Sequence, residues 1–103
     1  MAFSQESDIL RRLRLIEQLK ADLVVSVGEL FRAVAKNSET ALADGLASVV
    51  IACYILGRRL GIDFAVLDEA IDNQLNQNIK KNHEVEKWFG DYSEYLRHLR
   101  RKE

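Results

Sequence analysis

The sequence lacks proline altogether and is poor in the other residues that interrupt a chain or bind a metal. Its 103 residues include five glycines, two histidines and one cysteine, Cys53. Since clusters of proline and glycine mark most linkers, their absence excludes a long linker and favours helix along most of the chain. A single cysteine also excludes an internal disulfide and fits a reducing compartment, so we expect a cytoplasmic protein.

Several kinds of chemistry are excluded because their patterns are missing. His83 and His98 are fifteen residues apart and have no cysteine or acid at the spacing of a zinc site. No serine or cysteine has a recognisable base partner, and no glycine-rich phosphate loop is present. The formal net charge is −1, so no strong field draws the protein to nucleic acid or to a membrane. We therefore expect neither of them as a partner.

Hydrophobic residues make up 48% of the chain, which is high for a single small domain spanning residues 1–103. A chain of this size buries only about two-thirds of its unfolded surface, so a monomer would struggle to hide them. The apolar stretch Ala41–Leu56 holds one charge and is shorter than the roughly 20 residues of a membrane span. We therefore predict a helix at 41–60 that its own chain and a second copy bury together, in a homodimer or a homotetramer.

Apolar periodicity predicts helices separated by short breaks. The first runs over Ser7–Lys36 with Ser7 as its N-cap, either as one helix or as two with a break near residues 20–22. Ser38 is a good N-cap for the second helix, which extends to Leu60. Gly61 follows where a helix commonly ends in a left-handed residue.

The last forty residues predict shorter helices. Asp63 caps a third helix that frays through the polar stretch 76–82. A further segment begins near His83 and is broken by a glycine. A short amphipathic helix then starts at Asp91 or Ser93. The predicted fold class is therefore all-α.

Two acids stand out because their surroundings are apolar. Asp44 is the single charge within Ala41–Leu56, and Glu29 is the single acid in VVSVGELFRAV. A buried carboxylate is costly unless it is paired or holds a metal, so these acids could form half of a magnesium site. Two simpler interpretations stay open: Glu29 is a solvated residue that meets Arg32, and Asp44 is exposed at the end of the bundle or stabilised by the helix dipole.

The two central segments resemble a known family. VSVGELFRAV followed by ALADGLASVVIACYILGRRLGIDFAVLDEAI is similar to the MazG family of all-α nucleoside triphosphate pyrophosphohydrolases, over about Ala21–Asn82. In that family two acids precede the V-G-E-L step, a Glu-x-x-Asp pair opens the next helix, and that helix ends in an L-G-I-D turn. The tail HEVEKWFGDYSEYLRHL resembles the short MazG-like subgroup. The resemblance implies a MazG-like helical bundle completed by self-association, in which two subunits form a four-helix core.

The same resemblance implies a magnesium site that this chain retains only in part. The two leading acids of the family fall on Val25 and Ser26, and the third is present as Glu29. The second pair falls on Ala41 and Asp44, so three of five acids are absent. Glu29 and Asp44 are thus the candidate metal ligands, and magnesium, which relies on several oxygen ligands, is expected to bind weakly.

The resemblance also implies two candidate nucleotide-binding residues. Asn78 and Lys81 fall near positions where MazG-like enzymes carry polar and basic groups facing the phosphates, although a polar helix end has the same composition. The function we predict is a weak or non-catalytic nucleotide-binding or interaction module. The alternative is an active magnesium-dependent pyrophosphohydrolase. It would require Glu29 and Asp44 to meet a third acid in an open cleft.

Overall fold

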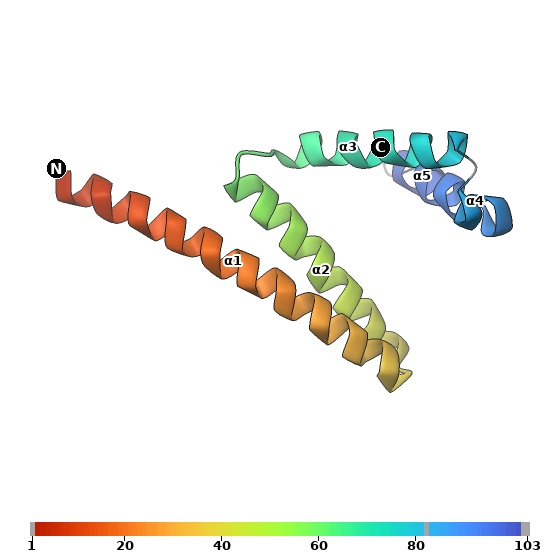
Figure 1. Ribbon diagram of the computed structural model, residues 1–103, viewed down its shortest axis with the longest axis horizontal. Coiled ribbons are helices and arrows are strands. Elements are labelled where there is room, and N and C mark those ends of the chain that lie inside the picture. Colours follow the sequence, from red (N-terminus) through yellow and green to blue (C-terminus); the bar gives the residue numbers. More distant parts are fainter. Residues whose placement is uncertain (1, 82, 102–103) are drawn as a thin grey trace. The chain divides into compact units, whose positions relative to one another are not determined.

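The computed structural model describes the backbone of residues 2–81 and 83–101 and, within them, the side chains from Ser7 onward. Over these ranges the chain forms five helices and no strand, which confirms the all-α fold class (Figure 1): α1 (Ala2–Lys36), α2 (Glu39–Arg59), α3 (Phe64–Lys80), α4 (Glu84–Phe89) and α5 (Asp91–Arg101). The helices divide into two compact units, Met1–Phe64 and Ala65–Glu103, and each is described by itself. The single domain over 1–103 stays a prediction.

The first helix is longer than the sequence predicted. It begins at Ala2, so Ser7 lies inside it and the prediction of an N-cap there was wrong. Between the two alternatives for residues 7–36, the structure has one continuous helix. Near the suspected break, Lys20 donates to Glu17 at 2.8 Å and Gln18 donates to Asp22 at 3.0 Å. These pairs, three and four residues apart, lie along the surface of an intact helix.

A two-residue turn reverses the chain between α1 and α2. Asn37 adopts a positive φ of 55°, a conformation that asparagine tolerates better than most residues. Ser38 is extended, with φ −115° and ψ 119°, and its hydroxyl oxygen accepts a hydrogen bond from the Ala41 N–H at 3.3 Å. The predicted N-cap at Ser38 is therefore confirmed. The turn sends α2 back along α1 as a helical hairpin (Figure 1).

Small residues bring the two helices of the hairpin into close contact. A Cβ atom placed on Gly45 of α2 would lie 3.3 Å from the Cα atom of Leu30 on α1. Ala33, one turn further along α1, is buried, with 7% of its surface exposed. Because glycine has no side chain, the two backbones approach each other at this level more closely than larger residues would allow.

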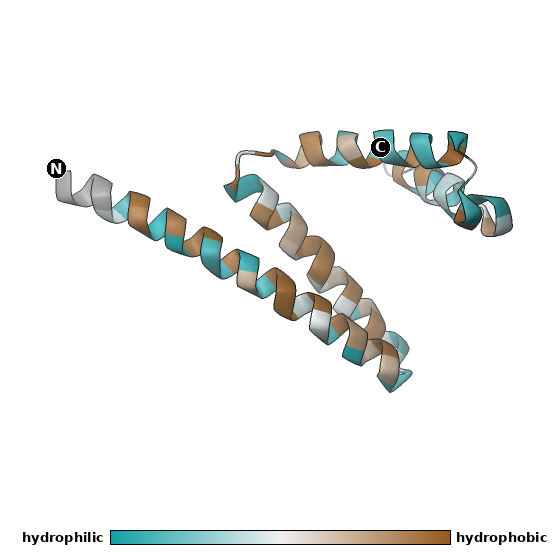
Figure 2. Cartoon of the chain, viewed as in Figure 1, coloured by the Kyte–Doolittle hydropathy of each residue, from teal (hydrophilic) through white to brown (hydrophobic). Residues whose placement is uncertain are grey.

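Only one side of α2 is covered by α1. No residue of α2 is buried, and Leu46, Val50 and Ile51 are each about half exposed or more. Figure 2 shows apolar residues along most of this helix. With 21 residues, and with an 18-residue stretch whose mean hydropathy is 1.7, α2 is long and apolar enough to cross a membrane, by length and composition only. The same features also fit a helix that a second copy of the chain covers.

Two left-handed glycines end helices where the sequence predicted a break. Gly61, with φ 94°, follows the end of α2 at Arg59, and Gly90, with φ 68°, separates α4 from α5. The ring of Phe64 meets Tyr54 edge-on at 6.0 Å and lies beneath the Arg58 guanidinium at 4.8 Å. These ring contacts hold the chain after Gly61 against the end of α2.

The second unit follows the predicted order with one correction. The stretch expected to fray is helical through Lys80, and the Asn76 side chain donates to the Asp72 carbonyl oxygen at 3.1 Å. The Nδ1 atom of His83 accepts from the Val85 N–H at 3.2 Å and caps α4. Of the two predicted starts for α5, Asp91 is the observed one.

The contact between α4 and α5 is polar at one end. The Ser93 backbone N–H donates to both carboxylate oxygens of Glu86 at 3.2 Å, and its hydroxyl also donates to Glu86. Leu75 on α3 and Leu96 on α5 are the buried apolar residues of this unit among those described. The core of the unit is therefore small.

The close approach at Gly45 predicts a contrast between two glycines. Nothing lies within 4 Å of a Cβ atom at Gly28, in the middle of α1. Both Gly28→Val and Gly45→Val improve helix propensity slightly, by a few tenths of a kcal/mol. We expect Gly28→Val to change the free energy of unfolding little, whereas Gly45→Val should lower it by about 1–3 kcal/mol because the Leu30 backbone must move. Chemical denaturation followed by circular dichroism measures both, and equal effects would contradict the contact.

Candidate functional site

The structure brings Glu29 and Asp44 to one cavity between α1 and α2. The cavity has a volume of about 340 Å³. Each helix contributes four of its residues with the spacing i, i+3, i+4 and i+7, which is one face of a helix. We call it the acid cavity, and its lining is Glu29, Arg32, Ala33 and Lys36 from α1 and Ala41, Asp44, Gly45 and Ser48 from α2.

The position of the acid cavity follows from the helix contact. Ala33 and Gly45 line the cavity and also lie at the point where the two backbones approach. Glu29 is four residues before Ala33, and Asp44 is adjacent to Gly45, so packing of the small residues places both acids at the same level. The carboxylates come from different helices and both are exposed to solvent.

Two cations share this cavity with the two acids. Arg32 lies one turn after Glu29, and Lys36 lies one turn after Arg32. Among the side chains that the structure describes, neither Glu29 nor Asp44 forms an ion pair within 4.0 Å. Glu29 is exposed to solvent, as one of the two open interpretations had it, but without an ion pair to Arg32. The cavity therefore holds two negative and two positive charges in contact with water.

The residues present do not fit a complete magnesium site. Magnesium prefers an octahedral shell of oxygen atoms, and carboxylates supply them in most protein sites. Among the side chains that the structure describes, no group of three or more His, Cys, Asp or Glu could hold a metal. Two carboxylates supply too few oxygen donors for such a shell, and the two cations beside them disfavour a further positive charge.

Of the three positions where the resemblance expects further acids, Ala41 alone lines the cavity. Ala41 lines it one turn before Asp44, so a longer side chain there would point into the same space. Val25 is 57% exposed and is not part of the lining, and Ser26 is half-buried. Neither Val25 nor Ala41 fills the cavity. The geometry thus has the open space that an enzyme would need, but not the third acid.

Asn78 and Lys81 lie in the second unit, at the C-terminal end of α3. The Asn78 carbonyl oxygen accepts from the His83 N–H at 3.2 Å, and the residue is half-buried. Lys81 is exposed, and its N–H donates to the Gln77 carbonyl oxygen at 2.9 Å. These are backbone contacts of a helix end, and the role of both residues toward a nucleotide stays a prediction.

Sequence reasoning missed Lys36 and Ser48 as neighbours of the two acids. Their signal was present in the chain, because Lys36 is seven residues after Glu29 and Ser48 is four after Asp44. The spacing shows which residues share one face of a helix, but not which residues of the other helix that face contacts. The contact can be predicted only when the register between the two helices is known.

Comparison with known proteins gives one match. The model of the MazG-like family matches residues 9–92, a range that includes Glu29, Asp44, Asn78 and Lys81. No curated protein and no solved structure matches the chain.

Proposed function

Since this chain belongs to the MazG-like family, we propose that it is a self-associating helical module with an incomplete magnesium site and little or no catalytic turnover. The family match indicates the nucleoside triphosphate pyrophosphohydrolase-like superfamily. The observation that carries the proposal is the composition of the acid cavity, in which Glu29 and Asp44 face Arg32 and Lys36 without a third acid.

The charges of the cavity favour binding over catalysis. Hydrolysis between phosphates needs a metal that neutralises charge and activates water, and two carboxylates hold such a metal poorly. Arg32 and Lys36 offer positive charge directly to an anionic group, as a metal would in a complete site. We therefore infer that a nucleotide, where it binds, does so weakly and without efficient cleavage.

The proposed partner is a second copy of the chain. The exposed apolar residues of α2 face away from the hairpin contact, and covering them would remove a large apolar surface from water. A pair of hairpins that face each other through α2 gives a four-helix core, the arrangement in which helices of a bundle pack their apolar sides together. We place this assembly in the cytoplasm, with dimer and tetramer both compatible with the exposed face.

One prediction concerns metal binding. Magnesium should bind the wild-type protein weakly, with a millimolar or higher dissociation constant. Ala41→Glu should tighten it by about tenfold or more, because the new carboxylate enters the acid cavity beside Asp44. Ala43→Glu is the matched control, since Ala43 is an exposed α2 residue outside the lining. Calorimetric titration of magnesium measures all three proteins, and a control that binds as tightly as Ala41→Glu would refute the assignment of the cavity.

A second prediction concerns turnover. Release of pyrophosphate from the common NTPs and dNTPs should be negligible with magnesium or manganese, because loss of one electrostatic group in a site commonly costs about 10²–10³-fold in rate. Asp44→Asn should then leave the low background rate of pyrophosphate release unchanged. The assay couples pyrophosphate to inorganic phosphate detection. Robust wild-type hydrolysis that Asp44→Asn abolishes would instead establish the active pyrophosphohydrolase.

A third prediction concerns assembly. The wild-type protein should be at least a dimer in buffer without detergent, and Val50→Lys should dissociate or unfold it because a charge enters a dry interface. Gln18→Lys adds the same charge at an exposed position on α1 and should leave the assembly intact. Light scattering coupled to size-exclusion chromatography gives the mass of each. A stable wild-type monomer at micromolar concentration, or a protein that dissolves only in detergent, would contradict the proposal.

A further inference from the structure

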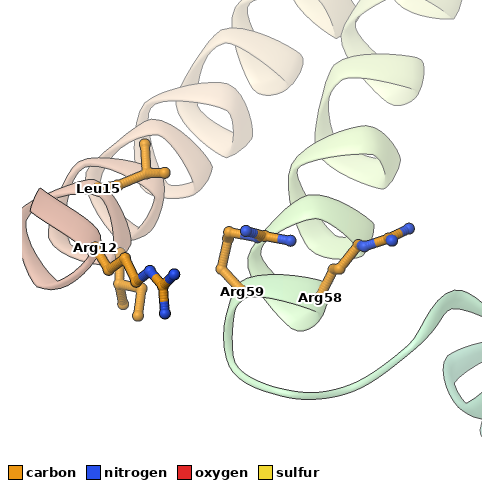
Figure 3. A pocket seen from close by; sticks show the side chains of 5 residues that line it. Arg12, Leu15, Arg58 and Arg59 are labelled. Carbon is orange, nitrogen blue, oxygen red and sulfur yellow. The ribbon is translucent and has the colours of Figure 1, made fainter. Parts of the chain in front are cut away.

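A second cavity lies between α1 and the C-terminal end of α2. Its volume is about 310 Å³, and we call it the arginine cavity (Figure 3), lined by Arg12, Leu15, Ile16, Arg58 and Arg59. Arg12 precedes Glu29 by seventeen residues on α1, which places it about 25 Å from the acid cavity along the helix. The two cavities are therefore separate sites on one hairpin.

The arginine cavity has positive charge and no carboxylate in its lining. None of its three arginines forms an ion pair within 4.0 Å with a side chain that the structure describes. The arginines of the cavity along α5, by contrast, have acidic partners. Arg97 pairs with Glu94 and lowers the pKa of that carboxyl group, and Arg100 lies 3.9 Å from the Asp72 carboxylate. Like charges that gather without a counter-charge repel one another, and an anion would relieve that repulsion.

The arginines of the cavity come from both helices that border it. Figure 3 shows Arg12 extending from α1 toward the space and Arg59 on α2 across from it, with the Arg59 guanidinium group turned toward the side of Arg58. The Arg58 guanidinium group lies over the Phe64 ring, 4.8 Å from the ring centre, and this cation–π contact holds it in place. The partial negative charge at the end of α2 accounts for arginines at 58 and 59 alone. It gives no reason for Arg12, which comes from the other helix.

We propose that the arginine cavity binds a phosphate group, held between Arg12 and Arg59. The guanidinium group is planar and presents paired N–H donors that match phosphate oxygens, so two of them can hold one phosphate from opposite sides. Leu15 and Ile16 offer apolar surface to the remainder of the ligand. The phosphate can belong to a soluble compound or to the headgroup of an anionic lipid, since both present the same chemistry.

The experiment has two arms that separate these sources. In the first, pyrophosphate is titrated calorimetrically into the full chain without divalent metal, at low and at high salt. In the second, the chain is sedimented with vesicles of phosphatidylcholine alone or mixed with phosphatidylglycerol. We expect salt-sensitive binding in at least one arm, weakened roughly tenfold or more by Arg12→Gln and by Arg59→Gln, since glutamine removes the charge and the charge-assisted hydrogen bonds of the guanidinium group.

Three further variants sharpen the test. Arg14→Gln removes the same charge from α1 two residues away, outside the lining, and should bind like the wild type. Arg32→Gln removes a cation of the acid cavity and can lower only the weak anion binding proposed there. The binding that Arg12→Gln and Arg59→Gln weaken should persist in Arg32→Gln, which separates this proposal from the proposed function. Arg12→Lys keeps the charge but not the paired donors and should bind with intermediate affinity.

The result that overturns the proposal is equally specific. It is absence of binding in both arms, an equal loss in Arg14→Gln, or a loss confined to Arg32→Gln. Circular dichroism of each variant verifies that the helices are intact, so that loss of binding reports the contact rather than unfolding.

Discussion

The contact between the backbones of α1 and α2 is the constraint on which the rest of the first unit depends. Gly45 allows α2 to lie against Leu30 and Ala33, and this sets both the register and the rotation of each helix. The same rotation directs Glu29 and Asp44 into one cavity and leaves the remaining sides of α2 exposed. The acid cavity, the packing of the hairpin and the exposed apolar surface of α2 thus all follow from this one close contact.

The acid cavity brings two carboxylates together but holds as many cations as acids. A carboxylate at position 41 would stand one turn from Asp44, and alanine keeps the helix but supplies no ligand. Arg32 and Lys36 make the charge of the lining neutral overall, so the cavity lacks the excess of negative charge that attracts a divalent cation. The small number of carboxylates and the presence of two cations both disfavour a divalent cation.

Local features of the fold could be predicted from the sequence, because they depend on neighbouring residues. As predicted, the side chain of Ser38 caps the start of α2, and two glycines with positive φ, Gly61 and Gly90, follow helix ends. The start of α1 was missed because Ser7, a good cap, is also tolerated inside a helix when residues that favour helix precede it. The helical end of α3 was missed because Asn76 bonds back to Asp72 instead of ending the helix.

The sites were less accessible to sequence reasoning than the helices were. The two acids could be found from their apolar surroundings, and their meeting from the resemblance. Arg12, by contrast, is separated from Arg59 by 47 positions, and nothing in the pattern of either helix indicates that they share a space. Such pairs depend on the long-range register, which is set by Gly45 and its partners and not by periodicity.

The two-residue turn at Asn37 and Ser38 also has a consequence for folding, because it distinguishes formation of the hairpin from the proposed association of two copies. Contacts between α1 and α2 begin at residues close in sequence, and such local contacts form quickly because little loop entropy is lost. The contacts of the hairpin form within one chain, in a step independent of protein concentration. In the proposed assembly, covering α2 with a second copy is bimolecular, so at low concentration the apolar side of α2 would stay exposed until two chains meet.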